Sequence, residues 1–268
     1  MLFKFKNRLV EQDTICVMAI ANLTDDSFYA GSRLSVSGGE FDEQTFRKHI
    51  DKALSEGAGI IDLGACSTRP QSQPVSPETE WQRLQPALEI MKSEYPQTPL
   101  SVDTFRPQIA ERVAEYGIDI VNDISGGGQD MYDTVAKAGL TYVLTHNAPY
   151  ETDDKVVDYF ARRIDMLQRA GVHDIWIDPG FGFGKTTDDN FRMLRLLPWL
   201  KTMTGHPILV GLSRKSMIYK TLDITPEEAL NGTIVCNTIA AMLGADILRV
   251  HDVLPATQLS ALINKTKN

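Results

Sequence analysis

The sequence has few cysteines, and their placement excludes two kinds of site. Only three occur in 268 residues, Cys16, Cys66 and Cys236, and they are far apart and without C-x-x-C spacing. This odd number and wide spacing argue against a disulfide framework and against a zinc knuckle. Such cysteine usage is typical of a reducing compartment, and we expect a cytoplasmic protein.

Long apolar runs are missing as well. The first ten residues, MLFKFKNRLV, contain no apolar core of signal-peptide length. No apolar run elsewhere in the chain approaches the roughly 18 residues of a membrane span. We therefore expect neither export nor insertion into a membrane.

Positive charge is also scarce. The chain has 27 Lys and Arg against 35 Asp and Glu, a net charge of −8 at pH 7. Because nonspecific nucleic-acid binding requires a basic face, we expect no nucleic-acid partner. An anionic small molecule remains possible, since charges are screened over about 8 Å at physiological salt and local Arg and Lys can dominate a pocket.

A glycine is missing where a nucleotide phosphate loop requires one. The stretch DPGFGFGKTT, residues 178–187, ends like a Walker A loop, but Pro179 stands at the position of its first glycine. The three alternating glycines of this stretch therefore need another explanation.

The chain is rich in short apolar runs separated by stretches with helical spacing. The runs are ICVMAIAN (15–22), GIIDLG (59–64), LSVD (100–103), DIVNDI (119–124), YVLTH (142–146), DIWID (174–178), ILVGLS (208–213) and ILRVHD (247–252). Each run predicts a strand buried on both faces. Stretches between them, such as 41–57 and 153–171, have helical periodicity and close on a glycine.

Eight strands alternating with helices predict an α/β protein whose parallel sheet closes into a (β/α)₈ TIM barrel, a fold of about 250 residues. No linker rich in Gly, Ser or Pro divides the chain, so we expect a single domain over residues 1–268. Within it, 1–14 form an N-terminal extension with room for a small hairpin at the barrel bottom, and 15–268 form the barrel. Long loops at 23–41 and 65–77 follow the first two strands, and such loops are commonly functional.

Polar residues gather at the predicted carboxyl ends of the strands, where active sites of such barrels lie. They are Asn22, Asp62, Asp103, Asn122, His146, Asp178, Ser213, Lys215, Arg249 and His251. Arg249 and His251 are two positions apart in one strand, so both side chains point to the same side of the sheet and suit an anion.

Taken singly, each of these residues also has a structural interpretation. Asp62, Asp123 and His146 could be structural, and Asp103 could cap the helix expected near Pro107. The set as a whole favours a site, because several buried charges at one rim require a ligand or a network.

Seven short motifs at these strand ends resemble those of the dihydropteroate synthases. In chain order they are NLTDDSF (22–28), STRP (67–70), SVDT (101–104), NDI (122–124), DPGFGFGK (178–185), GLSRKS (211–216) and RVHDV (249–253). The resemblance covers residues 15–253, and SRKS together with RVHDV separates this family from other pterin-binding barrels.

The resemblance implies that 6-hydroxymethyl-7,8-dihydropterin pyrophosphate condenses with p-aminobenzoate to 7,8-dihydropteroate and pyrophosphate, on the way to folate. It places Asp103, Asn122, Asp178 and Lys215 at the pterin, and Asn22, Arg249 and His251 at the pyrophosphate. It also implies an Mg²⁺ ion with Asn22 as its protein ligand. Magnesium commonly keeps several waters and takes only one or two protein oxygens.

The resemblance further implies an SN1-like mechanism, in which pyrophosphate departs first and Asp103 lies near the resulting pterin cation. Asp103, Lys215 and Arg69 form the implied catalytic set, and no covalent nucleophile with an adjacent base is evident. The implied p-aminobenzoate pocket consists of Phe28, Thr68, Arg69, Phe183 and Ser213. Sulfonamides are the inhibitors of this family. We expect Lys185 to face solvent.

The chain departs from the family pattern in both long loops. Asp25 replaces the proline of the usual T-P-D-S-F, and Ala65 and Cys66 stand where G-G-E-S-T-R-P has glycine and glutamate. These changes bear on the response to p-aminobenzoate and sulfonamides more than on the reaction. The family also implies a homodimer through the last helices, and ATQLSALINK (256–265) is amphipathic, although the same face could cover the barrel.

Two alternatives remain open at this point. A corrinoid-dependent methyltransferase with a pterin-binding barrel would keep the pterin pocket but have no use for Arg249, His251 and SRKS. A noncatalytic pterin-binding paralogue would keep Asn122 and Asp178 but lose Asp103, Arg249 or Lys215, and none of these is lost.

Overall fold

The computed structural model describes residues 2–5, 8–11, 15–24, 41–66 and 75–267, the first two segments and Lys267 by their backbone alone. Eight parallel strands lie in one sheet, in the order β8-β7-β6-β5-β4-β3-β10-β9. Their bounds are β3 (Cys16–Asn22), β4 (Ile60–Gly64), β5 (Leu100–Asp103), β6 (Ile120–Asp123), β7 (Thr141–Thr145), β8 (Ile175–Asp178), β9 (Leu209–Val210) and β10 (Ile247–Val250).

The sheet closes on itself between its two outer strands. Ile177 of β8 forms a parallel bridge with Ile208, directly before β9, and its N–H donates to the carbonyl of Pro207 at 2.9 Å. The predicted (β/α)₈ barrel is therefore confirmed. The seven pairs of neighbouring strands in the sheet are all parallel, as crossover connections require.

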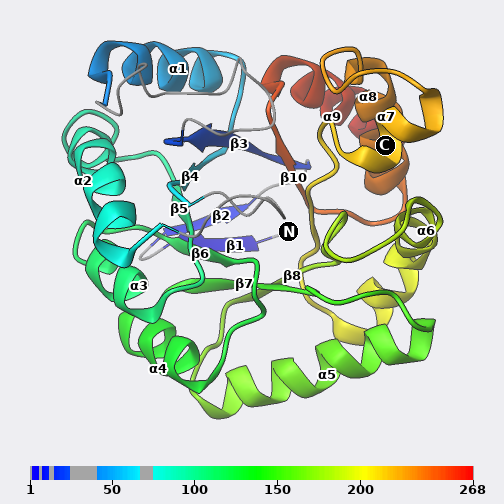
Figure 1. The fold of residues 1–268 in the computed structure, drawn as a ribbon, viewed down its shortest axis with the longest axis horizontal. Helices are drawn as coiled ribbons and strands as arrows, with labels where there is room; N and C mark the ends of the chain where they lie inside the picture. Colours follow the sequence, from blue (N-terminus) through cyan, green and yellow to red (C-terminus); the bar gives the residue numbers. More distant parts are fainter. Residues whose placement is uncertain (1, 6–7, 12–14, 25–40, 67–74, 268) are drawn as a thin grey trace.

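Helices surround the barrel on its outer side (Figure 1). The described helices are α1 (Glu43–Ser55), α2 (Pro77–Glu94), α3 (Pro107–Ala114), α4 (Gln129–Ala138), α5 (Asp153–Arg169), α6 (Thr187–Thr204), α7 (Ser216–Leu222), α8 (Leu230–Met242) and α9 (Val253–Lys267). As the sequence predicted, α1 and α5 are followed by glycines at positive φ, Gly57 and Gly171, both at 94°.

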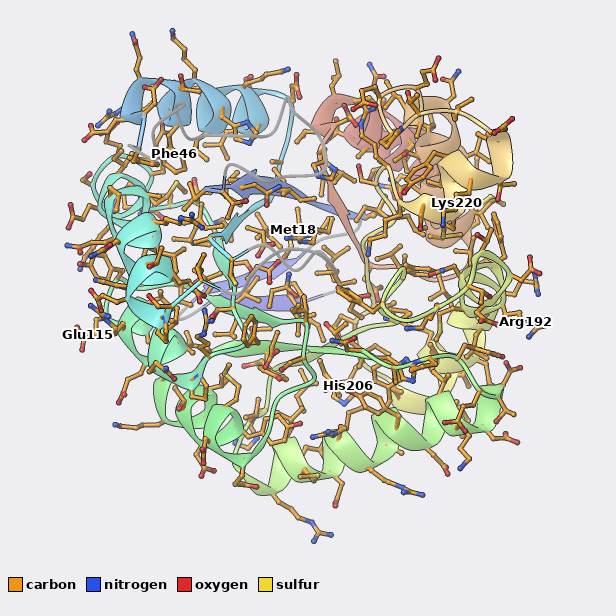
Figure 2. All side chains as sticks on the ribbon, viewed as in Figure 1. Met18, Phe46, Glu115, Arg192, His206 and Lys220 are labelled. Carbon is orange, nitrogen blue, oxygen red and sulfur yellow. The ribbon has the colours of Figure 1, made fainter. Side chains whose placement is uncertain are left out.

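Apolar side chains pack on both faces of the sheet, and this explains why the strands are continuous apolar runs in the sequence. Inside the barrel lies a buried cluster of Cys16, Met18, Ile60, Ile120, Val143, Trp176, Leu209 and Ile247. A larger cluster, which includes Phe46, packs the helices against the outside of the sheet. Figure 2 shows Met18 near the centre of the barrel and Lys220 at its outer surface. Strands buried on both faces need no polar alternation.

The extension before the barrel forms the expected hairpin. Strands β1 (Leu2–Phe5) and β2 (Arg8–Glu11) pair antiparallel, with Leu2 opposite Glu11 and Phe5 opposite Arg8. In the view of Figure 1 this hairpin lies across the middle of the barrel.

The seventh barrel strand is shorter than the apolar run 208–213 predicts. Only Leu209 and Val210 form β9, because the chain turns away from β10 after Val210 and reaches Arg214, which has a φ of 55°. That turn directs Ser213 and Lys215 to the mouth of the barrel rather than along it.

Candidate active site

The interior of the barrel changes from apolar to polar toward the carboxyl ends of its strands. Residues two positions apart on a strand share a face. The inward-facing apolar residues are followed on the same face by polar ones in four strands: Ile60 by Asp62, Ile120 by Asn122, Trp176 by Asp178 and Ile247 by Arg249. The predicted gathering of polar groups is therefore a real feature of one end of the barrel.

Arg249 lies at the centre of this group. Its Nε donates to Oδ2 of Asp62 at 2.7 Å, and its Nη2 donates to Oδ2 of Asp103 at 2.9 Å. Asn122 donates from Nδ2 to the same Asp62 oxygen at 3.3 Å. The guanidinium thus joins two carboxylates that come from β4 and β5.

Two buried acceptors in this network have no partner among the described residues. Oδ1 of Asp62 and Oδ1 of Asn122 are both shielded and make no hydrogen bond within that part of the chain. Because an unsatisfied buried acceptor is costly, the pair is suited to a ligand with donor groups, such as the amino and ring N–H groups of a heterocycle.

The carboxyl of Asp103 is held in a largely buried, charged environment. Burial raises the pKa of its carboxyl to about 7, although Arg249 opposes the rise and Asp62 adds to it. The alternative role as a helix cap is wrong, because α3 has Arg106 at its N-cap position and no side-chain cap there.

Asp178 and Lys215 form the second part of the site. Oδ1 of Asp178 accepts the N–H of Gly180 at 2.7 Å, and the Lys215 ammonium donates to the carbonyl of Phe181. Burial lowers the pKa of Lys215 to about 8 against the attraction of Asp178, and burial raises the pKa of Asp178 against Lys215. Lys215 Nζ lies 5.0 Å from the ring centre of Phe183.

The alternating glycines of DPGFGFGK allow the backbone to pack tightly. Gly180 has a φ of 71°, and a Cβ there would lie 2.3 Å from the carbonyl oxygen of His146. At Gly182, with a φ of 88°, a Cβ would lie 3.4 Å from the Lys215 side chain. Glycine fits both demands, so the alternating glycines are explained by close packing of this loop against the end of β7 and against Lys215.

Lys185 does not face solvent as expected. Its Nζ donates to the carbonyls of His146 at 2.9 Å, Gly180 at 2.8 Å and Phe183 at 3.3 Å. The long aliphatic part of the side chain lets the ammonium group turn inward, away from solvent. The sequence alone does not reveal this orientation.

His251 lies beside Ser213 at the end of β10. Nδ1 of its imidazole is 3.0 Å from Oγ of Ser213, and its backbone N–H donates to the same oxygen at 3.3 Å. Burial, with Arg249 nearby, lowers the pKa of His251 to about 3. The imidazole is therefore neutral at pH 7 and offers an anion a hydrogen bond rather than a charge.

Asn22 ends β3 and pairs with Gly64 of β4, whose other neighbour, on β5, is Asp103. A Cβ at Gly64 would lie 3.3 Å from Oδ1 of Asn22 and 4.0 Å from Oδ2 of Asp103. Glycine thus leaves open a space bordered by two oxygens, the ligand type that Mg²⁺ prefers. The donor set fits a magnesium ion that takes its remaining ligands from water and phosphate.

Three of the predicted p-aminobenzoate residues lie outside the described residues. These are Phe28, Thr68 and Arg69, and Asp25 lies outside them too. Cys66, at the start of the second loop, is within the described residues. Burial raises the pKa of its thiol, and the negative charge of the nearby Glu80 adds to the rise. A thiol of this kind stays protonated, and Cys66 is not an activated nucleophile.

Some strand-end residues are structural and others had roles that the sequence did not reveal. Asp123 accepts from the N–H and Oγ of Ser125 at 2.7 and 2.6 Å and from the Tyr142 hydroxyl at 2.8 Å, which confirms its structural interpretation. Asp62 also makes a structural contact, because its Oδ2 accepts from Nε of Arg249 at 2.7 Å. Arg214 was missed although its motif was recognised: it pairs with both oxygens of Asp252, at 2.9 and 3.1 Å.

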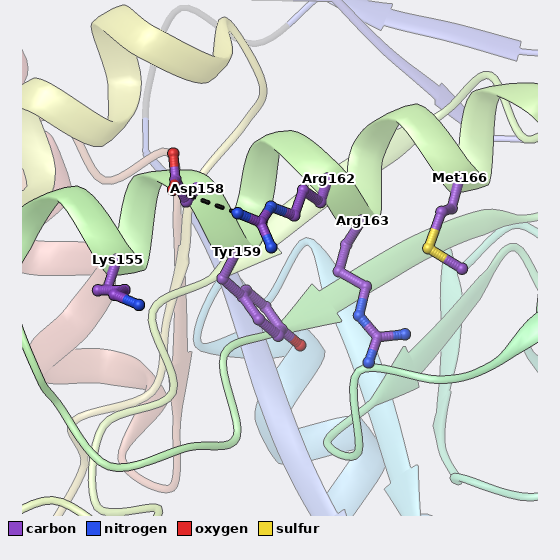
Figure 3. Close-up of a pocket in the computed structure, with 6 residues that line it drawn as sticks. All are labelled: Lys155, Asp158, Tyr159, Arg162, Arg163 and Met166. Carbon is purple, nitrogen blue, oxygen red and sulfur yellow. Dashed lines mark ion pairs between the residues drawn. The ribbon is translucent and has the colours of Figure 1, made fainter.

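A separate hollow lies on the outer side of α5 (Figure 3). It is lined by Lys155, Asp158, Tyr159, Arg162, Arg163 and Met166, all from that one helix. None of the strand-end residues borders it. Tyr159 and Arg163 instead support loops near the barrel mouth, through the carbonyls of Thr145 at 2.7 Å and Gly127 at 3.0 Å.

Comparisons with known proteins agree with this geometry. A family model described as pterin binding enzyme matches residues 18–251. A dihydropteroate synthase of Clostridium beijerinckii is 37% identical over 248 residues, which cover 89% of each chain. No helix among the described residues is long and apolar enough to cross a membrane.

Two solved structures extend the likeness to the whole fold. A Yersinia pestis dihydropteroate synthase with a sulfonamide drug superposes with a TM-score of 0.89 at 32% identity, covering 100% of this chain and 99% of that one. A Xanthomonas albilineans dihydropteroate synthase with 4-aminobenzoic acid gives a TM-score of 0.89 at 34% identity, covering 99% and 98%.

Proposed function

The chain belongs to the dihydropteroate synthases among the pterin-binding enzymes, and from this premise we propose how its residues divide the reaction. The reaction joins 6-hydroxymethyl-7,8-dihydropterin pyrophosphate to p-aminobenzoate, giving 7,8-dihydropteroate and pyrophosphate in folate synthesis. The observation that carries the assignment of roles is the single network at the barrel mouth that joins Asp62, Asp103, Asn122 and Arg249.

Asn122, Asp178 and Lys215 bind the pterin in this proposal. The free Oδ1 of Asn122 and the carboxylate of Asp178 accept hydrogen bonds from the aminopyrimidinone edge, and Lys215 donates to the ring from the other side. A site whose buried polar groups are matched to one ring rejects rings that lack those groups.

Arg249, His251 and Asn22 bind the pyrophosphate. Arg249 supplies the positive charge and neutral His251 a hydrogen bond, while Asn22 and phosphate oxygens would hold Mg²⁺. When bound, the ion would neutralise part of the charge on the leaving group. Because Arg249 is held by two carboxylates from β4 and β5, its guanidinium meets the phosphate at a fixed place.

The chemistry then follows from the positions of Asp103 and Arg249. The bond from the pterin methylene carbon to oxygen breaks first, and its electron pair leaves with the pyrophosphate. Ionised Asp103 stabilises the pterin cation; unit charges about 4 Å apart are worth about 4 kcal/mol at an effective dielectric of about 20, or on the order of 10³ in rate. The amine of p-aminobenzoate attacks the methylene carbon and loses a proton.

The p-aminobenzoate site combines described and undescribed residues. Phe183 borders it beside Lys215, and Ser213 lies behind it against His251. Phe28, Thr68 and Arg69 complete it from the two long loops, with Arg69 closing over the reacting groups. The Yersinia pestis relative binds a sulfonamide drug, and this chain is expected to bind the same inhibitor class.

A homodimer is part of the proposal, with α8 as its contact surface. Val235, Ile239 and Met242 follow one another at helical spacing and are 57%, 40% and 72% exposed. The opposite side of α8 is buried through Cys236, Ala240 and Ala241, so the helix is apolar on both sides. An apolar stripe of this kind is suited to a second copy of the same helix.

One apolar face of α9 covers the barrel through the buried residues Ala256, Leu259 and Ile263. Leu254 and Leu262 of the same helix are 45% and 70% exposed and add to the proposed contact surface. We further propose one domain over 1–268 and a cytoplasmic location, the latter supported by three cysteines that are far apart in the chain and lack C-x-x-C spacing.

The test is product formation by the purified protein. Incubation with the dihydropterin pyrophosphate, p-aminobenzoate and Mg²⁺ is expected to give dihydropteroate and pyrophosphate in equal amounts. Methyl transfer from a methylated pterin without pyrophosphate release would favour the methyltransferase alternative, and tight pterin binding without any product would favour the noncatalytic one.

A further inference from the structure

Lys185 is the one charged residue of DPGFGFGK to which the proposed reaction gives no role. It follows the three glycines and directly precedes Thr186, the N-cap residue of α6. Its ammonium is turned inward, away from the helix, and is bound by three backbone carbonyls. The donor capacity of an ammonium group is three hydrogen bonds, so no donor remains for a substrate.

The three carbonyls come from two different strand ends. His146 directly follows β7, whereas Gly180 and Phe183 belong to the loop after β8. These backbones approach so closely that a Cβ at Gly180 would lie 2.3 Å from the His146 oxygen. Carbonyl oxygens pointing into one small space repel one another, and a cation placed between them removes that repulsion.

The loop held by Lys185 is the loop that positions the pterin groups. The N–H of Gly180 is bound to Oδ1 of Asp178 at 2.7 Å while its carbonyl is bound to Lys185 at 2.8 Å. The next carbonyl, that of Phe181, accepts from Lys215. Displacement of Gly180 would therefore move the partners of Asp178 and Lys215 together.

We propose that Lys185 is a positioning residue for the pterin: it ties the loop after β8 to the end of β7 and so fixes Asp178 and Lys215 relative to one another. The inference rests on the proposed function, because it assigns Lys185 to the pterin half of that site. Its charge acts in the same direction: burial raises the pKa of Asp178, and Lys215 and Lys185 both oppose that rise by favouring the ionised form.

The experiment compares Lys185→Met with Lys220→Met. Methionine keeps the length and apolar stem of lysine but cannot donate, and Lys220 is an exposed lysine on α7. Binding of the bare 6-hydroxymethyl-dihydropterin and of pyrophosphate is measured separately by calorimetry at pH 7. We expect Lys185→Met to weaken pterin binding by about tenfold or more and to leave pyrophosphate binding within about twofold, while Lys220→Met changes neither.

The outcomes separate a positioning role from a general structural one. Unchanged pterin binding in folded Lys185→Met, or equal weakening of both ligands, would overturn the inference. Lys185→Arg, which keeps the cation, should recover part of the pterin affinity, and no recovery would count against a role for the charge.

Should the methionine variant not fold, Lys185→Gln serves in its place. Glutamine retains two donors on a shorter chain, so pterin binding should again weaken more than pyrophosphate binding. If the unaltered protein itself fails to bind the bare pterin, the proposed function falls, and this inference falls with it.

Discussion

Arg249 and Asp62 are 187 positions apart in the chain and are joined by a hydrogen bond of 2.7 Å at the mouth of the barrel. The second oxygen of this carboxylate is buried and has no partner among the described residues. Asp62 thus holds the guanidinium that the proposed mechanism needs at the pyrophosphate, and its side chain has no exposed surface.

Replacing Asp62 by Asn should therefore weaken use of the pyrophosphate ester. Asparagine keeps the shape of the side chain but removes the charge that orients Arg249, and breaking a buried charge pair is costly. We expect kcat/KM for the dihydropterin pyrophosphate to fall by about tenfold to a hundredfold. A variant that folds normally and retains the kcat/KM of the unaltered protein would contradict this role.

Lys215→Ala and Asp178→Asn should each remove most turnover while the fold is retained. Both residues lie at the carboxyl end of the barrel, away from the apolar layer that stabilises it. Steady-state rates together with a circular dichroism spectrum check the prediction. Wild-type kcat/KM in either variant would show that the pterin pocket lies elsewhere.

Arg249→Ala should distinguish the two halves of the substrate. The guanidinium, held by Asp62 and Asp103, is assigned to the pyrophosphate, whereas the pterin ring edge is assigned to Asn122, Asp178 and Lys215. Affinity for the pyrophosphate ester should fall more than affinity for the bare pterin, and calorimetry with both ligands measures the difference. Equal losses would argue against an anion-binding role for Arg249.

The pH dependence of kcat/KM should have two limbs. The mechanism needs ionised Asp103 and protonated Lys215, and burial raises the pKa of Asp103 to about 7 and lowers that of Lys215 to about 8. Activity should therefore rise with pH through about 7 and fall through about 8, since kcat/KM reports groups of the free enzyme. A flat profile between about pH 6 and pH 9 would contradict both assignments.

Charge introduced on the exposed stripe of α8 should separate the proposed dimer. Met242 is 72% exposed and Ile239 40%, so glutamate at both positions disturbs little packing inside the subunit but opposes an apolar contact between subunits. Light scattering after size exclusion should show a dimer for the unaltered protein and a monomer for the double variant. A monomer in both cases, or a dimer in both, would refute α8 as the contact surface.

Much of the fold was predictable because its signals are local. Strands buried on both faces leave continuous apolar runs, and the glycines after α1 and α5 mark where those helices end. The end of β9 was not predictable, since Leu212 is as apolar as the strand before it and the turn depends on the backbone of Arg214.

The gathering of polar residues at one end of the barrel was predictable, and the contacts among them were much less so. Strand-end position brought Asn122, Asp178 and Arg249 together in the prediction, because parallel strands end on the same side of the barrel. The roles of Asp62 and Lys185 depend on partners 187 and 39 positions away along the chain, and no local pattern encodes such pairings. The neutral state of His251 likewise comes from burial that only the folded barrel provides.

The most direct test of the account is pyrophosphate release by the purified protein with each component omitted in turn. The account predicts release only when the dihydropterin pyrophosphate, p-aminobenzoate and Mg²⁺ are all present, with dihydropteroate formed in equal amount. Absence of release from the complete mixture, despite tight binding of the pterin, would contradict it.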